Sequence, residues 1–531
     1  MNETNKSAWF MSLEKAFGKL AAIAAVAVLL IFPLYVKDFY FDILMAKYQF
    51  YYIVMLAMFA IALVILIGYI IRDFRYEDGK NIKEMFRSLS IKKMPLSHVF
   101  ASLFLITCVI STLQSEYLYE SFWGNEGRLT GLFLLSIYVI SFLFISRFLK
   151  LKKRYLNLFL IAGMLACILG ITDYFKLNLL HFKDELVLGE WPIYTSTFGN
   201  INTYNAYVAL VFGCCGALFV YAKDAKEKIW YFICYVIATY ASIVGGSDNA
   251  YLAVFALFGF IPFWAFKDWK KLEKYFIMLA SFATVMYIAG LIHDHMGDKV
   301  EIVEGVFGVL TRSHFLLYMV IGLWLLTALL YIIEAVAKEK VYKIGKLLVR
   351  IWTILVAIVV LVVGYVLYDA NAGGHADRYE GIQSYVHFDD DWGTQRGMVW
   401  RIALEDYKEK FTWNQKIFGY GPETFGIMTH QWNNDETIAK TTVIYDNAHN
   451  EYLQYFVTVG SFGLIFYVGM LVCACVEMNR KKEKAPYVMG CFFAVLCYAV
   501  QATVNLCVPI VTPVMWMLMS VGISQEENEK Q

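Results

Sequence analysis

Charged side chains are scarce in this chain. Asp, Glu, Lys and Arg make up 17% of its 531 residues, apolar residues make up 59%, and the mean hydropathy is +0.54. A soluble protein cannot bury that much apolar surface, so the composition predicts a membrane protein with many spans. The net charge of +1 indicates no partner by itself, because the charges gather in short clusters between apolar runs.

Three sequence signatures are missing. No C-x-x-C pair occurs, and all ten cysteines lie in or beside apolar runs, so we expect buried free thiols and no disulfide framework. No internal repeat is visible, whereas many transporters contain inverted repeats. The first apolar run lacks a small-x-small cleavage site, which favours a retained membrane anchor over a cleaved signal peptide.

Apolar runs of spanning length predict an all-α, polytopic fold with about 12–14 transmembrane helices. The fourteen candidate runs are 20–36, 50–71, 98–113, 129–146, 155–175, 204–221, 229–244, 250–266, 275–292, 314–337, 347–368, 452–475, 485–505 and 507–524. The expected regions are an N-terminal membrane region (1–119), a second with outer-face motifs (120–368), a large external loop with short helices (369–448), the C-terminal membrane helices (449–524) and a tail (525–531).

The distribution of lysine and arginine predicts the orientation. If the N-terminus is inside, the inner segments hold thirty of these residues and the short outer loops hold seven. Because cytoplasmic loops carry the excess of Lys and Arg, we expect both termini in the cytoplasm and the 369–448 loop outside the cytoplasmic membrane. Eight of the nine histidines then lie on the outer side, so any chemistry is expected there.

His449 is the most suggestive ionisable residue. It precedes an apolar helix predicted from Tyr452 to about Cys475, where a positive dipole end would favour a neutral imidazole that can act as a general base. The alternative is an interfacial histidine without a chemical role. If the helix is continuous, five residues fall on one stripe of its surface: His449, Leu453, Phe456, Gly460 and Gly463. The two glycines on this stripe would let another helix pack closely.

Four outer patches combine polar groups with glycine. They are 123–131, 196–204, 245–250, and the long loop with Arg396 and Arg401. Together they could line one cavity, because polar groups at membrane edges are often substrate contacts. The alternative is that they only cap helices and form turns.

Within the long loop, Arg396 and its neighbouring glycine suit a phosphate, since a guanidinium offers bidentate hydrogen bonds. Trp400 and the other loop tryptophans could stack on sugars or lie on lipid headgroups. The segments 293–295 and 389–391 could attract a metal, but a polar loop and a solvated acidic turn explain them better, so no metal site is predicted.

Four motifs resemble, in order, those of the O-antigen ligase and polymerase superfamily. His449-Asn450, followed after nine residues by Gly460 and then Gly463, resembles its H-[NSQ]-x9-G-x-x-[GTY] signature. The other matching segments are 127–131, similar to an early G-x-x-R-x-x-G-like motif, 199–206, similar to G-N-P-N-x-x-A with Ile201 in place of proline, and 396–425, similar to R-x-x-x-W…G-x-G-x-x-x-F. The resemblance covers about residues 120–520.

One position departs from the family pattern. Asp248 stands where many members have an arginine thought to hold the lipid diphosphate. Arg128, Arg312 or Arg378 would have to supply the second positive charge in this chain.

The resemblance implies a membrane-embedded, GT-C-like glycosyltransferase. Such enzymes transfer a glycan from undecaprenyl diphosphate at the outer leaflet to a lipid, glycan or protein hydroxyl, with no cofactor, metal or nucleic acid. His449 would be the catalytic base. The implied diphosphate-binding residues are Arg396, Arg128 and Arg312; the implied substrate-binding residues are Asn200, Asn202, Asn450, Arg401 and Trp400; Gly460 and Gly463 would pack helices.

Ligase, polymerase and protein oligosaccharyltransferase are not separated by these motifs. Two other classes remain open from the sequence: a transporter or flippase of lipid-linked oligosaccharide, and a non-catalytic component of a wall-polysaccharide assembly complex. Charged residues deep in several spans would favour the transporter, and a replaced His449 or Arg396 would favour the non-catalytic component.

Overall fold

The computed structural model describes residues 8–88, 94–125, 127–303, 305–337, 344–441 and 445–526. Helices form nearly all of the regular structure in these ranges, and the strands there are four two-residue segments. Strand β1 (Lys150–Leu151) pairs in parallel with β4 (Gln525–Glu526), and β2 (Tyr194–Thr195) pairs antiparallel with β3 (Gly199–Asn200). The all-α class predicted from composition is confirmed.

Ten helical segments in the described ranges are long and apolar enough to cross a membrane. They are Ala8–Leu34 (α1, η2 and η3), α2 (Ile43–Glu77), α4 (Leu96–Gln114), α7 (Lys153–Tyr174), α8 (Ile201–Tyr221), α9 (Ala225–Val244), Trp269–Lys299 (α12 and η6), α14 (Phe315–Ala337), α15 (Gly345–Asn371) and α21 (Gly460–Lys481). Four other predicted runs form shorter apolar helices: α6 (Leu132–Phe148), Asn249–Ala265 (α10 and α11), Val488–Val504 (α22 and η9) and α23 (Thr512–Ile523).

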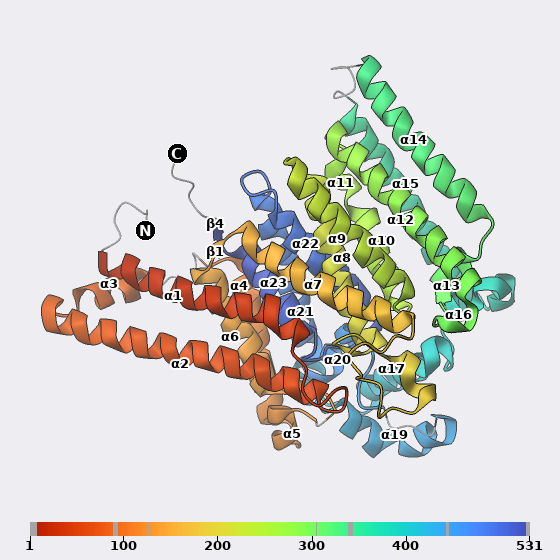
Figure 1. Cartoon of the computed structure of the whole chain (residues 1–531). Helices are drawn as coiled ribbons and strands as arrows, with labels where there is room; N and C mark the ends of the chain where they lie inside the picture. Colours follow the sequence, from red (N-terminus) through yellow and green to blue (C-terminus); the bar gives the residue numbers. More distant parts are fainter. Residues whose placement is uncertain are drawn as a thin grey trace.

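The bundle has a closely packed centre and lipid-exposed flanks. Helix α8 is buried along its full spanning window, and it lies with α22 in the middle of Figure 1. Gly213 of α8 lets this contact form, because an added Cβ there would collide with the Phe493 carbonyl of α22. In contrast, no residue in the apolar window of α15 is buried, as expected of a helix that largely faces lipid.

The first and last described elements lie at the opposite end of the helices from the large loop. In Figure 1 the start of α1 and strand β4 are toward the left, whereas α17 (Trp392–Glu409) and α19 (Phe425–Thr441) are toward the lower right. The loop has its own apolar cluster, which includes Phe411, Phe425 and Ala448. Helix α17 is one of the short helices predicted in this loop, and its first turn is distorted at residues 393–395.

The C-terminal helix predicted from 452 to 475 is broken. It forms α20 (Glu451–Thr458) and α21, which are separated by Val459. The single stripe from His449 to Gly463 was therefore wrong. The break is at Gly460, which adopts φ +83°, a conformation that favours glycine, and an added Cβ there would collide with the Ile417 carbonyl.

Contacts from the loop fill this break. The backbone amides of Tyr420 and Gly421 donate to the carbonyls of Val457 and Thr458, at 3.1 and 3.0 Å. In an uninterrupted helix these carbonyls would accept hydrogen bonds from later amides of the same helix. Here the two loop amides donate to them instead. Gly463 still faces a neighbouring helix, with Thr107 of α4 within 4 Å of a Cβ added there.

The remaining described elements are short connectors and loop helices. They are α3 (Lys80–Ser88), α5 (Leu118–Trp123), η5 (Leu188–Ile193), α13 (Gly305–Thr311), η8 (Ala376–Ile382), α16 (Gln383–Val386) and α18 (Trp413–Phe418). All ten cysteines are free thiols, eight of them buried. Residues 527–531 of the predicted tail lie outside the described residues.

Candidate functional site

His449 lies at the junction between the loop and α20. Asn450 caps α20, and its side chain accepts hydrogen bonds from the amides of Tyr452 and Leu453, at 3.0 and 3.1 Å. His449 precedes the cap with φ +50°, and its amide donates to the side-chain oxygen of Asn447 at 2.9 Å. Its partly exposed imidazole has no hydrogen-bond partner within the described ranges, so both ring nitrogens are available to a substrate.

The backbone before His449 is held from two sides. The Ala448 amide donates to the Gln454 side chain of α20 at 3.0 Å. The Ala448 carbonyl accepts from the indole N–H of Trp400 in α17 at 2.8 Å. Trp400 therefore positions the histidine segment, and it also lines a cavity of about 530 Å³ in the loop.

The imidazole of His449 is neutral at physiological pH. Burial is the largest cause, and together with the positive charges of Arg396 and Arg128 it lowers the pKa of His449 to about 4, while Asp446 opposes the shift. The neutral state agrees with the sequence-based expectation, and burial and the two cations are its causes. A neutral imidazole can accept a proton.

Arg128 connects the first motif to the histidine signature. Its guanidinium donates to Asp446 at 3.0 Å, three residues before His449. Gly127 permits the approach, because a Cβ there would lie 2.9 Å from the Asp446 carboxylate. The buried Nε–H of Arg128 has no partner among the described residues, so the group retains a free donor.

Arg396 lies on α17 and is the second cation near His449. Burial lowers its pKa, while Tyr251 and Asp248 oppose that effect through their charges. Within the described ranges its guanidinium makes no hydrogen bond or salt bridge. Asp248, at the position where the resembled pattern has an arginine, therefore influences the pKa of Arg396. Asp248 is also fixed by the Val306 amide, which donates to it at 3.3 Å.

Asn200 and Asn202 join three segments of the chain. Asn200 caps α8 by accepting from the Asn202 amide at 2.8 Å. The Asn202 side chain accepts from Ser247 at 2.6 Å, and its carbonyl accepts from the side chains of Asn249 and Asn505. The predicted second and third patches are thus one hydrogen-bonded unit.

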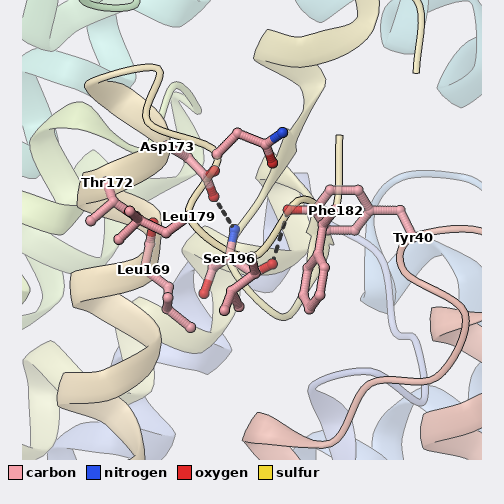
Figure 2. Close-up of a pocket in the computed structure, with 9 residues that line it drawn as sticks. Tyr40, Leu169, Thr172, Asp173, Leu179, Phe182 and Ser196 are labelled. Atoms are coloured by element: carbon pink, nitrogen blue, oxygen red, sulfur yellow. Dashed lines mark hydrogen bonds between the residues drawn. The ribbon is translucent and has the colours of Figure 1, made fainter. Parts of the chain in front are cut away.

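The turn at Ser196, which precedes this hydrogen-bonded unit, is held by two hydrogen bonds. Figure 2 shows the Ser196 amide donating to Asp173 and the Tyr40 hydroxyl donating to the Ser196 carbonyl, at 2.6 and 3.0 Å. The adjoining cavity, lined in part by Leu169 and Phe182, has a volume of only about 10 Å³. It holds no more than a water molecule, so this region supports the site and does not bind a sugar.

Arg401 and Arg312 are placed differently from the two cations near His449. Arg401 binds Asp390 through two hydrogen bonds of 2.8 and 3.0 Å, and also bonds Glu405 and Glu436. Its donors are thus occupied in holding the loop together. Arg312 is exposed at the end of α13 and donates to the Val303 carbonyl at 3.5 Å.

Two buried carboxyl groups near the site were missed by sequence reasoning. Glu423 is 2% exposed, and one of its oxygens has no partner in the described part of the chain. Burial raises its pKa to about 8, although Arg128 opposes the shift. Its place inside the 418–425 motif was the available signal.

The second missed carboxyl group is Glu451, two residues after His449. It is buried and accepts hydrogen bonds from the hydroxyls of Tyr467 and Tyr498, which lie on α21 and α22. Glu451 thereby ties the start of α20 to the membrane bundle. Its position beside His449-Asn450 could have drawn attention to it.

No metal centre is formed by the side chains in the described ranges, where no three His, Cys, Asp or Glu groups converge. At 293–295, His295 instead contacts the Leu291 carbonyl at 2.9 Å. At 389–391, Asp390 is bound to Arg401 and Lys440.

None of the curated proteins compared matches this chain. Residues 300–468 match the family model described as O-antigen ligase, a range that includes Arg396 and His449. The match and the multi-span helical fold indicate an O-antigen ligase- or polymerase-like function in polysaccharide biosynthesis. The match over residues 300–468 thus supports the chain's membership of the O-antigen ligase superfamily, as its motifs predict.

Proposed function

We propose that the protein transfers or polymerises a glycan from undecaprenyl diphosphate onto an acceptor hydroxyl at the outer face of the cytoplasmic membrane. The observation that carries this proposal is the neutral imidazole of His449, which has no hydrogen-bond partner among the described residues and is influenced by the guanidinium charges of Arg396 and Arg128. A proton acceptor next to two anion-binding groups is what a transferase with a diphosphate leaving group needs.

In the proposed reaction, the guanidinium groups of Arg396 and Arg128 bind the donor diphosphate. His449 takes the proton of the acceptor hydroxyl. The acceptor oxygen forms a bond to the anomeric carbon, the bond from that carbon to the diphosphate oxygen breaks, and undecaprenyl diphosphate leaves with inversion. No cofactor or metal takes part in this scheme.

The bound donor also strengthens the base. The diphosphate cancels the two positive charges that lower the pKa of His449 in the free protein. The pKa therefore rises when the donor binds, and the imidazole becomes a better proton acceptor in the complex. This relation favours proton transfer only after the leaving group is in place.

The proposed orientation has both termini in the cytoplasm and the 369–448 loop outside. The thirty-to-seven distribution of Lys and Arg supports it, as does the separation of the start of α1 and of β4 from α17 and α19 in Figure 1. The site then opens to the leaflet where the lipid-linked glycan is presented.

The test uses the purified protein in lipid with an undecaprenyl-diphosphate-linked glycan and EDTA. His449→Ala is compared with His430→Ala, which alters an exposed histidine of the same loop. A ladder of products lost only in His449→Ala supports a polymerase, and one block transferred to an added acceptor supports a ligase. Equal turnover by both variants contradicts the role of His449, and a retained anomeric configuration contradicts direct displacement.

A further inference from the structure

A basic cavity lies near the chain termini, away from the His449 site. Its volume is about 430 Å³, and it is bounded by the first half of α1, the connection from α6 to α7, and Gln525 of β4. Six cationic side chains and one carboxylate line it: Lys15, Lys19, Arg147, Lys150, Lys152, Arg154 and Glu14.

Tertiary contacts bring these charges together. A Cβ at Gly18 would lie 2.9 Å from the Phe148 carbonyl, so α1 approaches the end of α6 closely. Lys150 is opposite Gln525 in the β1–β4 pair, and its ammonium donates to the Gln525 side chain at 2.9 Å. The walls of the cavity are therefore fixed by backbone contacts from three parts of the sequence.

The cavity carries far more positive than negative charge. Glu14 lies 3.5 Å from Arg147, and it is the one carboxylate among the residues that line the cavity. Lys15 and Lys19 are exposed and make no hydrogen bond or salt bridge within the described ranges. Clustered like charges repel each other, so an anion with several oxygen acceptors would lower the energy of this arrangement.

The residues around the cavity favour a lipid as the ligand. Lys15 and Lys19 lie on Ala8–Leu34, a segment of spanning length, and Arg154 lies on the spanning helix α7. Apolar residues also line the cavity, among them Met11, which is 50% exposed, and Ala22. Cations over an apolar wall at the end of membrane helices match a phosphate head group joined to acyl chains.

We propose that this cavity binds the head group of an anionic phospholipid, in the leaflet on the side of the chain termini. Under the proposed orientation this is the inner leaflet, opposite to the glycan donor. The bound lipid bridges α1 to the α6–α7 connection. The proposal is independent of glycan transfer, and its test requires no donor.

The test compares Lys15→Gln/Lys19→Gln with Lys223→Gln/Lys226→Gln, which removes two exposed cations, one just before α9 and one in its first turn. The purified full chain is titrated with phosphatidylglycerol or chain-matched phosphatidylcholine, and bound lipid is counted by native mass spectrometry. We expect the wild type and the control to bind phosphatidylglycerol selectively. The cavity variant should bind it about 30-fold more weakly, which corresponds to about 1 kcal/mol for each lost cation.

A second variant and a second measurement keep the proposal testable if the first variant folds poorly. Glu14→Gln removes the one lining carboxylate and should strengthen phosphatidylglycerol binding about 5-fold. Phosphatidylglycerol should also raise the Tm of the wild type by a few degrees, an effect lost in the cavity variant.

Three outcomes would overturn the assignment. The first is equal phosphatidylglycerol binding by the cavity variant and the control. The second is equal binding of phosphatidylcholine by the wild type. The third is that inorganic phosphate or glycerol phosphate raises Tm as much as the lipid does, which would identify the ligand as a soluble anion.

Discussion

Arg128 donates a hydrogen bond of 3.0 Å to Asp446, across 318 positions of the sequence. Asp446 lies three residues before His449, so this bond connects the first outer motif directly to the histidine segment. The charge of Arg128 lowers the pKa of His449, and that of Asp446 raises it. The pair therefore influences both the position and the protonation of the candidate base.

Removing either Arg128 or Asp446 should reduce the contribution that the other residue makes to kcat/KM. The two side chains are 24% and 33% exposed, so solvent screens much of their attraction. In a double-mutant cycle with Arg128→Gln and Asp446→Asn, we expect a coupling of about 0.5–1 kcal/mol, seen as roughly 2- to 5-fold non-additivity in kcat/KM. Strict additivity would show that the bond does not serve the site.

The protonation of His449 should depend on Arg396. In the wild type the imidazole titrates at about pH 4, so kcat/KM should be independent of this group from pH 5 to 8 and fall below that range. Arg396→Gln removes a positive charge, so the pKa of His449 should rise. The acid limb of the kcat/KM profile should therefore shift to higher pH.

NMR of the His449 ring measures the same pKa without turnover. Arg378→Gln is the control, because Arg378 pairs with Asp369 in the loop. An identical titration of His449 in the wild type and Arg396→Gln would contradict the electrostatic coupling.

Trp400 should stabilise the histidine segment through its N–H group. Trp400→Phe retains an aromatic ring but leaves the Ala448 carbonyl, which belongs to a fully buried residue, without its donor. We expect a loss of about 1–3 kcal/mol in local stability together with a lower kcat. Thermal unfolding and steady-state kinetics measure these effects. Trp413→Phe is the matched control, since Trp413 is 81% exposed, and an equal effect in both variants would argue against positioning.

Gly460 should be required by its backbone conformation. Gly460→Ala places a side chain at φ +83° against the Ile417 carbonyl, so we expect a destabilisation of more than about 1 kcal/mol and a lower Tm. Gly364→Ala in α15 meets open space and should be neutral or slightly stabilising, because alanine is the better helix former. Similar Tm changes in the two variants would contradict the role of the helix break.

Glu423 should make the protein less stable as pH rises. Its folded-state pKa is about 8, above the unfolded value of about 4.3, so its contribution is complete below the lower value and is lost as pH rises to the higher one. Glu423→Gln resembles the protonated form at every pH. The Tm of this variant relative to the wild type should thus increase between pH 5 and 8. A constant difference would indicate that Glu423 is ionised in the folded protein.

Short motifs could indicate which segments of the chain come together near His449. The O-antigen ligase match over 300–468 agrees with the His449 signature, and the structure brings Arg128 and Arg396 close enough to affect that histidine. The role of Trp400 could not be predicted, because sugar stacking, lipid contact and a hydrogen bond to Ala448 all suit a tryptophan in a polar loop. Only the fold brings its N–H to that carbonyl.

The sequence by itself determined the all-α membrane class and the places of the apolar helices, because run length and hydropathy are local properties. Only the tertiary structure decided where the helix predicted from 452 to 475 breaks, since the Ile417 carbonyl that occupies the space at Gly460 comes from another segment. It also decided which arginines remain available. Arg401 and Arg396 are alike in sequence context, but three carboxylates surround only Arg401. Charge pairing depends on residues distant along the chain, and local patterns do not record it.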